Sequence, residues 1–453
     1  MKRWLLIAGL LSLVPLGSPG PAAAETATGT DEVTWHWFGS LRMRPEYNDN
    51  LTDFSAARDD KIGYASYRVN LGTDIGLDKG VSVTLNAQAL GKWGEDQTPI
   101  RGTSTVSSFA NQVGFFEAYV DAKHIYDQPF SLRVGRQRLV FGDQWLLGDL
   151  DFYGGTSWDG IRGDLEFHRA TVTPFWASVA KLEQPEILRN LTDAEGNPID
   201  ASGGDFDLYG LWSTWKLPGT NGLDAAILYS FDHRSVGGFP FQDKRWTYTV
   251  RYSWGAKTGP FFNGDLAAQT GNTVNTERTD FATIHANAME LTGGWVWIRA
   301  GDPYRIQLRY ARYSGDDAGT SGTNETFVPL AMNFHERYGL VDAWTGFWRN
   351  QAYIGGVPGY EVLQVLFDVK IPSGVRLKVF GQTQRRTTDI AAAGSLRSLG
   401  QEFGVSASGD YGKHVTLDVG FAQIYPGTAA AAEPPLFAQD TARRLYVNTI
   451  VRF

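Results

Sequence analysis

The chain has 453 residues, a formal net charge of -8 and no cysteine. The lack of cysteine excludes a disulfide-built extracellular scaffold, and the acidic balance argues against a nucleic-acid partner. Aromatic residues make up 13% of the chain, yet mean hydropathy is only -0.26. Beyond the N-terminus there is no run of about 20 apolar residues that could span a membrane as a helix. This combination favours a transmembrane β-barrel, with a secreted soluble β-protein as the alternative.

The first element in chain order is a secretory signal over residues 1–24. A basic pair precedes an apolar stretch from Trp4 to Val14, and a small-residue cleavage site ends at Ala24. The apolar stretch is too short to cross about 30 Å of hydrocarbon as a helix. We therefore expect export, cleavage near Ala24, and one barrel domain over residues 25–453 in the outer membrane of a Gram-negative-type cell.

Eighteen segments that alternate apolar and polar residues follow the signal. Such alternation predicts strands with one oily face and one polar face. The strands are expected at 33–47, 60–77, 80–92, 111–123, 129–138, 156–168, 169–182, 205–217, 221–233, 241–255, 260–271, 281–299, 304–314, 359–371, 374–386, 400–410, 413–425 and 442–453. Ala288, Glu290 and two glycines interrupt the pattern in 281–299, so a barrel of sixteen strands stays open as an alternative.

The connections between the expected strands alternate between short and long. Short connections with turn residues fall at 78–80, 218–222, 301–303, 372–374 and 411–413. Long connections fall at 93–110, 139–155, 183–204, 272–280, 315–358, 387–399 and 426–441. This asymmetry is typical of an outer-membrane barrel with short periplasmic turns and long extracellular loops. An even number of strands places both termini in the periplasm.

The polar faces of the strands define a predicted lumen. A charge that faces lipid near the midplane costs about 2–4 kcal/mol for Arg or Lys, so inward placement is favoured. The cations expected inside are Arg42, Arg44, Arg68, Arg133, Arg162, Arg251, Arg305, Arg309, Arg376 and Lys378, joined by Arg386, Arg444 and Arg452. The acids expected inside are Glu46, Asp74, Glu117, Asp164, Glu166, Asp368 and Asp418. Cations in a narrow constriction concentrate anions, although we expect some of these arginines only to brace the wall.

Residue types that carry catalysis are scattered along the chain. The seven histidines lie on separate segments, and no HExxH, GxSxG, P-loop or Cys/His metal spacing occurs. The sequence therefore predicts no enzyme, no metal site and no cofactor. An outer-membrane enzyme with a converging Ser/His or Asp/His pair, and an adhesive barrel plugged by its loops, are the competing classes.

Two stretches resemble the alginate-export family of outer-membrane barrels. One runs from Arg133 to Asp164, RVGRQRLVFGDQWLLGDLDFYGGTSWDGIRGD, and the other from Phe334 to Gln351, FHERYGLVDAWTGFWRNQ. Besides Arg133 and Arg162, the motif positions are Gly135, Arg136, Gln137, Gly142, Asp143, Gln144, Trp158 and Asp159. The alternating last strand ends on Phe453, which resembles the signal that such barrels present to their assembly machinery.

The resemblance implies a monomeric channel whose arginine-rich constriction passes an anionic exopolysaccharide, gated by an extracellular loop and a periplasmic turn. The expected partners are outer-membrane lipid, the barrel-assembly machinery through Phe453, an anionic polysaccharide or small anion, and a periplasmic scaffold. Export of a uronate-type polysaccharide is the leading interpretation. An uptake porin for small anions or organic acids, with the same fold, is the alternative.

Two local expectations concern the first family-like stretch. We expect Gly142–Gly155 to fold inward as a plug, with Asp143, Asp149 and Asp151 beside basic groups of the wall. Arg136 shares the parity of the oily strand face, so it either lies beyond the hydrocarbon at the strand end or follows a bulge.

Overall fold

The structure is a computed structural model of the chain. It describes residues 33–51, 54–57, 61–94, 112–149, 155–179, 206–232, 235–236, 239–240, 243–274, 281–299, 301–316, 322–330, 336–341, 343, 359–371, 373–388, 397–430 and 439–453. The expected signal segment 1–24 and Asp151 lie outside the described residues, as does most of the family-like stretch that ends at Gln351.

One sheet contains nineteen strands, and because β16 (Thr323–Asn324) has only two residues, eighteen long strands form the wall. These are β1 (Thr34–Asp49), β2 (Ile62–Gly76), β3 (Val81–Gly94), β4 (Gln112–Ala122), β5 (Phe130–Gln137), β6 (Trp158–Glu166), β7 (Ala170–Val179), β8 (Phe206–Lys216), β9 (Gly222–Asp232), β12 (Asp243–Gly255), β13 (Gly259–Val274), β14 (Phe281–Arg299), β15 (Asp302–Tyr313), β17 (Tyr360–Lys370), β18 (Arg376–Arg385), β19 (Ser398–Tyr411), β20 (Val415–Pro426) and β21 (Ala442–Arg452). The pair β10 (Ser235–Val236) and β11 (Phe239–Pro240) forms a separate small sheet, and the turns η2 (Asp78–Gly80) and η3 (Ile125–Asp127) are 3-10 helical.

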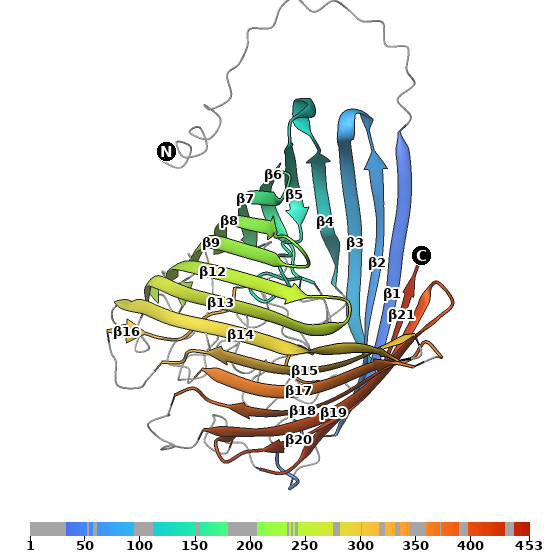
Figure 1. Ribbon diagram of the computed structural model, residues 1–453, viewed down its shortest axis with the longest axis vertical. Coiled ribbons are helices and arrows are strands. Elements are labelled where there is room, and N and C mark those ends of the chain that lie inside the picture. Colours follow the sequence, from blue (N-terminus) through green and yellow to red (C-terminus); the bar gives the residue numbers. More distant parts are fainter. Residues whose placement is uncertain are drawn as a thin grey trace, which may run out of the picture.

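The wall closes because β1 pairs with both β2 and β21 (Figure 1). Each long strand is antiparallel to its neighbours. At the seam, the Gly39 N–H donates to the Phe453 carbonyl at 2.9 Å, and the Phe453 N–H donates back at 3.1 Å. A closed barrel leaves no strand edge unpaired. The predicted antiparallel barrel of eighteen strands is therefore confirmed.

The interrupted segment 281–299 is one continuous strand, β14. Its inward residues Ala282, Ile284, Ala286 and Ala288 are each at most 4% exposed. Ile284, Ala286 and Ala288 share one buried apolar cluster with Trp145 and Phe327, so they pack against loop segments inside the barrel instead of lining water. This packing explains why the alternation of apolar and polar residues is weak in this strand. Because the segment is one continuous strand, the sixteen-strand alternative is removed.

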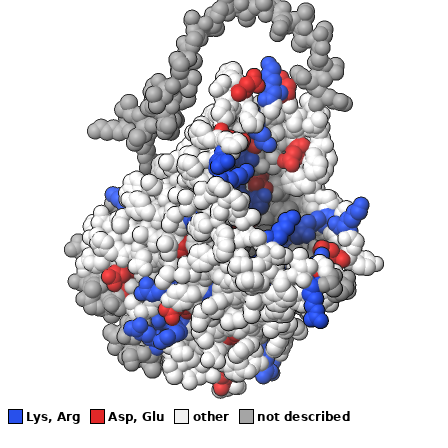
Figure 2. Space-filling view, viewed as in Figure 1, with Lys and Arg blue, Asp and Glu red and all other residues white. Residues whose placement is uncertain are grey.

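The outside of the wall is an apolar belt. On β17, Leu363 and Val365 point outward and are 44% and 50% exposed, whereas Gln364 between them is 3% exposed. Figure 2 shows large uncharged areas on the outside and charged side chains gathered around a hollow in the same face. Alternation of this kind matches a wall with lipid on one side and a polar interior on the other. No helix within the described ranges is long and apolar enough to cross a membrane.

The two ends of the barrel differ in their connections. Phe453 and short turns such as η2 and η3 lie at the end where β1 begins, which we call the periplasmic end. The longer connections, including those after β5 and β15, leave from the opposite, extracellular end. Short connections therefore lie at one end of the barrel and longer ones at the other, as the sequence predicts.

Gly135 on β5 has a backbone conformation that requires glycine. Its φ is 127°, and a Cβ there would overlap the Ala118 carbonyl oxygen on β4. We expect Gly135→Ala to destabilise the barrel by about 1–3 kcal/mol. On SDS gels, the faster-migrating band of the folded barrel should therefore disappear after heating to a lower temperature than for the wild type. Gly114→Ala is the control, because a Cβ at Gly114 meets nothing within 4 Å. Equal melting of both variants would contradict this account.

Candidate functional site

Residues 138–149, which we call the first inward loop, fold into the barrel from the end of β5. Leu139, Trp145 and Leu147 are at most 2% exposed. The Phe141 ring stacks on the Trp212 ring of β8 with centroids 4.8 Å apart, and the Trp145 indole N–H donates to the Tyr313 hydroxyl of β15 at 2.8 Å. Aromatic side chains thus hold this loop against two separate parts of the wall, β8 and β15, as expected for the inward segment.

The acids of the first inward loop have different partners. Asp143 Oδ1 lies 3.8 Å from Arg251 Nε on β12, which is a basic wall group as expected. Asp149 instead lies 3.2 Å from Arg138 Nη1, which belongs to the same loop and not to the wall. The expected placement of Asp149 beside a basic group of the wall therefore stays a prediction.

A second inward loop is formed by residues 322–330 and 336–341, between β15 and β17. The Val328 N–H donates to Gln269 Oε1 at 3.0 Å, and Gln269 Nε2 donates back to the Val328 carbonyl at 2.8 Å. Further along, the Leu340 N–H donates to Glu402 Oε1 at 2.7 Å. The buried Gln269 and Glu402 side chains therefore satisfy loop backbone groups that lie inside the barrel.

Arg337 joins the two inward loops to the wall, and we call Arg337, Asp143 and Glu290 the Arg337 latch. Arg337 Nη2 lies 2.9 Å from Asp143 Oδ2 and 2.9 Å from Glu290 Oε1. The Tyr338 hydroxyl also donates to Glu290. Burial lowers the pKa of Arg337, but the surrounding acids outweigh it and hold that pKa well above its ordinary value. The latch therefore stays charged and fixes both loops across the lumen.

Most of the cations predicted for the lumen face inward and are braced by acids. Arg44 meets Glu46 at 2.6 Å, Arg133 meets Asp121 at 2.9 Å, Arg162 meets Asp164 at 2.9 Å, Arg251 meets Asp224 at 3.2 Å, Arg309 lies 3.6 Å from Glu290, and Arg376 pairs with Asp368. Arg44 also meets Glu336 of the second inward loop at 3.0 Å. Such pairs orient the guanidinium groups without removing them from the lumen.

Some lumen cations are placed against each other. Arg42 is directly opposite Arg68 on the neighbouring strand, and Arg133 is directly opposite Arg162. Like charges in register destabilise a sheet. Within the described part of the chain, Arg305 and Lys378 form no ion pair of 4.0 Å or less; Arg305 lies over the Phe261 ring, 4.2 Å from its centroid. The periplasmic half of the lumen thus keeps an excess of positive charge near Arg305 and Lys378.

The remaining predicted lumen residues occupy varied positions. Asp74 accepts from the Thr84 hydroxyl at 2.6 Å, and Glu117 lies 3.1 Å from Arg138. Glu166 and Arg452 are exposed at the periplasmic ends of their strands, and Asp418 is on β20 opposite Asn448. Arg386 lies just beyond β18, buried, and donates to the Ala429 carbonyl at 3.0 Å, while Arg444 donates to the Leu340 carbonyl at 3.2 Å.

Arg136 of the family-like motif does not face the lumen. It is directly opposite Asp159 on β6, and its Nε and Nη2 donate to the two carboxylate oxygens at 2.8 Å and 3.0 Å. The pairing of β5 with both neighbours is regular, so Arg136 lies outward at the extracellular strand end without a bulge. Buried Gln137 donates to the Gly160 carbonyl at 3.3 Å. These motif residues fasten the strand pair that carries the first inward loop.

Other motif residues shape the loop itself. Gly142 has φ 57° and Gln144 has φ 65°, and the Gln144 N–H donates to the Phe141 carbonyl at 3.0 Å. Trp158 is 1% exposed at the start of β6. Arg337, Glu290 and Arg138 were not predicted as site residues; the only sequence signal was that Glu290 interrupts the alternation of its strand and Arg337 lies in the second family-like stretch.

Comparisons with known proteins agree with this architecture. The profile of the family described as alginate export matches residues 39–345. The crystal structure of Pseudomonas aeruginosa OpdO is similar, with a TM-score of 0.56, 14% identity, and coverage of 92% of this chain and 97% of that one. Acinetobacter baumannii OccAB1 gives a TM-score of 0.56, 11% identity, and 92% and 97% coverage. Pseudomonas aeruginosa OccK5 (OpdH) gives 0.53, 13%, and 92% and 98%. No curated protein matches the sequence.

Proposed function

Because the chain belongs to the alginate-export family and forms a closed outer-membrane barrel, we propose that it exports an anionic polysaccharide of the uronate class. Transport is passive, and cations of the lumen guide the substrate. The proposed track consists of Arg42, Arg44, Arg68, Arg133, Arg162, Arg251, Arg305, Arg309, Arg376 and Lys378. Arginine pairs with carboxylates in a bidentate manner, so this track suits a polymer that carries one carboxylate on each sugar.

The observation that carries the proposal is the direct cross-strand placement of Arg42 opposite Arg68 and of Arg133 opposite Arg162. A wall that needed only bracing would gain nothing from like charges in register. A carboxylate that enters between two such arginines relieves their repulsion. The part of this paired positive charge that neighbouring acids do not neutralise attracts a polyanion.

The acids beside the arginines keep the attraction for the substrate weak at each position of the track. Asp164 holds Arg162 at 2.9 Å and Asp121 holds Arg133 at 2.9 Å, so each guanidinium is oriented and partly neutralised. Conduction requires attraction that is weak at each site and repeated along the path. We therefore propose no single tight binding site, no catalytic residue and no cofactor.

An uptake porin for small anions is the second candidate. It is favoured by the two inward loops, whose Trp145, Phe327 and Tyr338 pack in one apolar cluster inside the barrel. A lumen narrowed in this way suits a small organic acid as well as an extended polymer. The same arginines would serve both substrates.

Other parts of the proposal concern targeting and partners. We propose cleavage of the N-terminal signal near Ala24, recognition of the exposed Phe453 by the barrel-assembly machinery, a monomeric state, and a periplasmic scaffold that delivers the polymer. The signal rests on the residue pattern of the first 24 positions, and the other three parts rest on the family resemblance.

The test is the reversal potential of single channels in a planar bilayer under a KCl gradient, repeated with oligouronate. We expect anion selectivity and current block by the charged oligomer, because its carboxylates occupy the arginine track. A neutral oligosaccharide of equal length is the control and is expected to block far less. Cation selectivity would refute the proposal. Anion selectivity without block by long oligomers, but with passage of small organic acids, would favour the uptake porin.

A further inference from the structure

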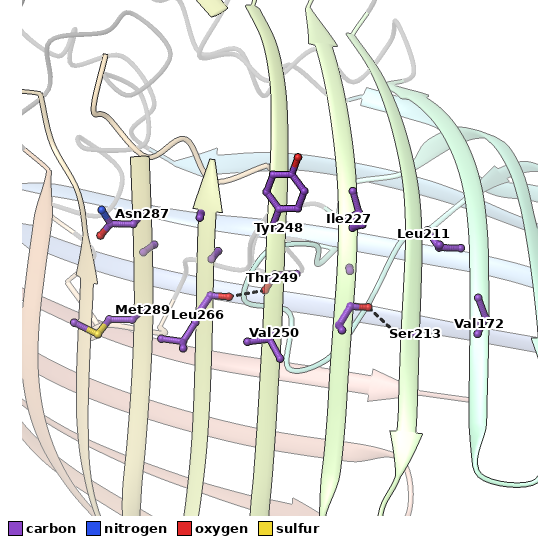
Figure 3. Close-up of a pocket in the computed structure, with 15 residues that line it drawn as sticks. Val172, Leu211, Ser213, Ile227, Tyr248, Thr249, Val250, Leu266, Asn287 and Met289 are labelled. Atoms are coloured by element: carbon purple, nitrogen blue, oxygen red, sulfur yellow. Dashed lines mark hydrogen bonds between the residues drawn. The ribbon is translucent and has the colours of Figure 1, made fainter. Parts of the chain in front are cut away.

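The outer wall of the barrel has a hollow that is separate from the lumen. It has a volume of about 730 Å³ and spans β7 to β14 (Figure 3). Leu211, Ile227 and Leu266 stand around it and are 47–50% exposed on the lipid-facing side. The smaller outward residues Ala225 and Ala268 leave the space open. The hollow is therefore a recess in the lipid-facing surface, with a volume in the range of about 300–1,000 Å³ that is usual for ligand pockets.

A group of charged side chains lies beside this hollow on the outer face. Arg312 on β15 is directly opposite Met289, which lines the hollow, and its Nη1 donates to Asn287 Oδ1 at 3.3 Å. Glu361 lies on the next strand, β17. It is directly opposite Arg312 of β15 on one side and Arg385 of β18 on the other. Two guanidinium groups thus flank one carboxylate, which leaves an excess of positive charge.

These two arginines are available to a ligand. Among the residues that the structure describes, neither Arg312 nor Arg385 has an acid within 4.0 Å, and Arg385 is exposed. The nearby Glu361 accepts a hydrogen bond from the Tyr310 hydroxyl at 3.0 Å. The carboxylate is therefore engaged by a neutral donor. Arg312 Nη1 donates to the neutral Asn287 amide, so neither guanidinium is neutralised by an ion pair with an acid of the described chain.

The level of the arginines corresponds to the edge of the membrane. Outward residues of β15 run from Ile306 and Leu308, 45% and 50% exposed, to Arg312 near the extracellular end of the strand. The outward-facing residues of β12 likewise end at the cation Lys244 toward the extracellular side, and those of β21 end there at Arg443. Cations that follow directly on an apolar belt lie at the depth of lipid headgroups.

We propose that Arg312 and Arg385 bind the phosphate of an anionic lipid of the outer leaflet, and that an acyl chain of this lipid fills the hollow. Arginine binds phosphate in a bidentate manner, and such bonds are strong where water is sparse. An apolar recess that continues from the cations gives the chain a place beside its headgroup. A soluble anion or a protein would not need a recess that faces hydrocarbon, so the lipid explains both features together.

The test is native mass spectrometry of the full barrel in detergent with added lipids. The probes are diphosphorylated lipid A, phosphatidylglycerol and phosphatidylcholine, each at equal concentration. We expect retention of the two anionic lipids, and at least a fivefold loss of that retention in the double variant Arg312→Gln/Arg385→Gln. Arg299→Gln is the matched control, because Arg299 ends β14 at the periplasmic end, and it is expected to retain lipid as the wild type does.

A second variant tests the hollow independently of the charges. Ala268→Phe fills the recess but leaves both arginines intact, and we expect it also to lower retention severalfold. Competition with inorganic phosphate should displace little lipid, because the acyl chain contributes to binding. Equal retention of phosphatidylcholine, full retention by the double variant, or a dimer that covers the hollow in place of lipid would each overturn the proposal. Gel mobility before heating confirms that every variant is folded.

Discussion

Deletion of residues 143–155 is expected to raise single-channel conductance severalfold. This segment contains Trp145, Leu146 and Leu147, which are at most 2% exposed inside the barrel. It also contains Asp143, whose Oδ2 lies 2.9 Å from Arg337 Nη2. Its removal takes the apolar obstruction out of the lumen and releases the second inward loop from its partner. Recordings in a planar bilayer at fixed salt measure the effect. Conductance equal to that of the wild type would show that the segment does not limit the path.

A milder change tests the effect of the Arg337 latch without removing any part of the first inward loop. Glu290→Gln keeps the size of the side chain but leaves the mostly buried Arg337 without one of its two acids. Breaking a buried pair on one side costs about 3–5 kcal/mol, so both loops should open more often. We expect frequent transitions to a larger conductance level. Asp159→Asn is the control, because it breaks the outward pair with Arg136 and leaves the latch intact.

The wall of this barrel could be predicted from sequence because each strand carries its own two-faced signal. The last strand was expected at 442–453 and is found at Ala442–Arg452. The signal failed only where the inner face is covered by protein. Ile284, Ala286 and Ala288 on β14 pack against loop residues and do not line water, so the rule that inward residues are polar does not apply there.

The interior of the barrel was less predictable because its contacts join distant parts of the chain. Arg337 meets Asp143 across 194 residues, and no local pattern marks such a pair. Arg136 had the parity of the oily face, and the structure places it outward opposite Asp159. Parity therefore identified which cations face inward. It could not show which of them are neutralised, since the partners come from neighbouring strands and from the inward loops.

The double variant Arg305→Glu/Lys378→Glu is expected to turn the selectivity of the channel from anions toward cations. Both residues face the lumen and are directly opposite Asp368, one on each side. Asp368 is already paired with Arg376, and within the described residues it forms no ion pair of 4.0 Å or less with Arg305 or Lys378. Replacing both cations changes the charge of the periplasmic half of the lumen by four units. In a narrow, low-dielectric path such a change dominates the energy of a passing ion.

The reversal potential under a KCl gradient measures this change, and we expect its sign to reverse. Arg299→Glu is the matched control: it also places a negative charge at the periplasmic end, but at the outward end of β14, so selectivity should stay close to that of the wild type. Block by oligouronate should disappear in the double variant and persist in the control. If the double variant keeps the wild-type reversal potential, the cations of this half do not border the path. The arginines would then act as braces of the wall, and the electrostatic track would have to be abandoned.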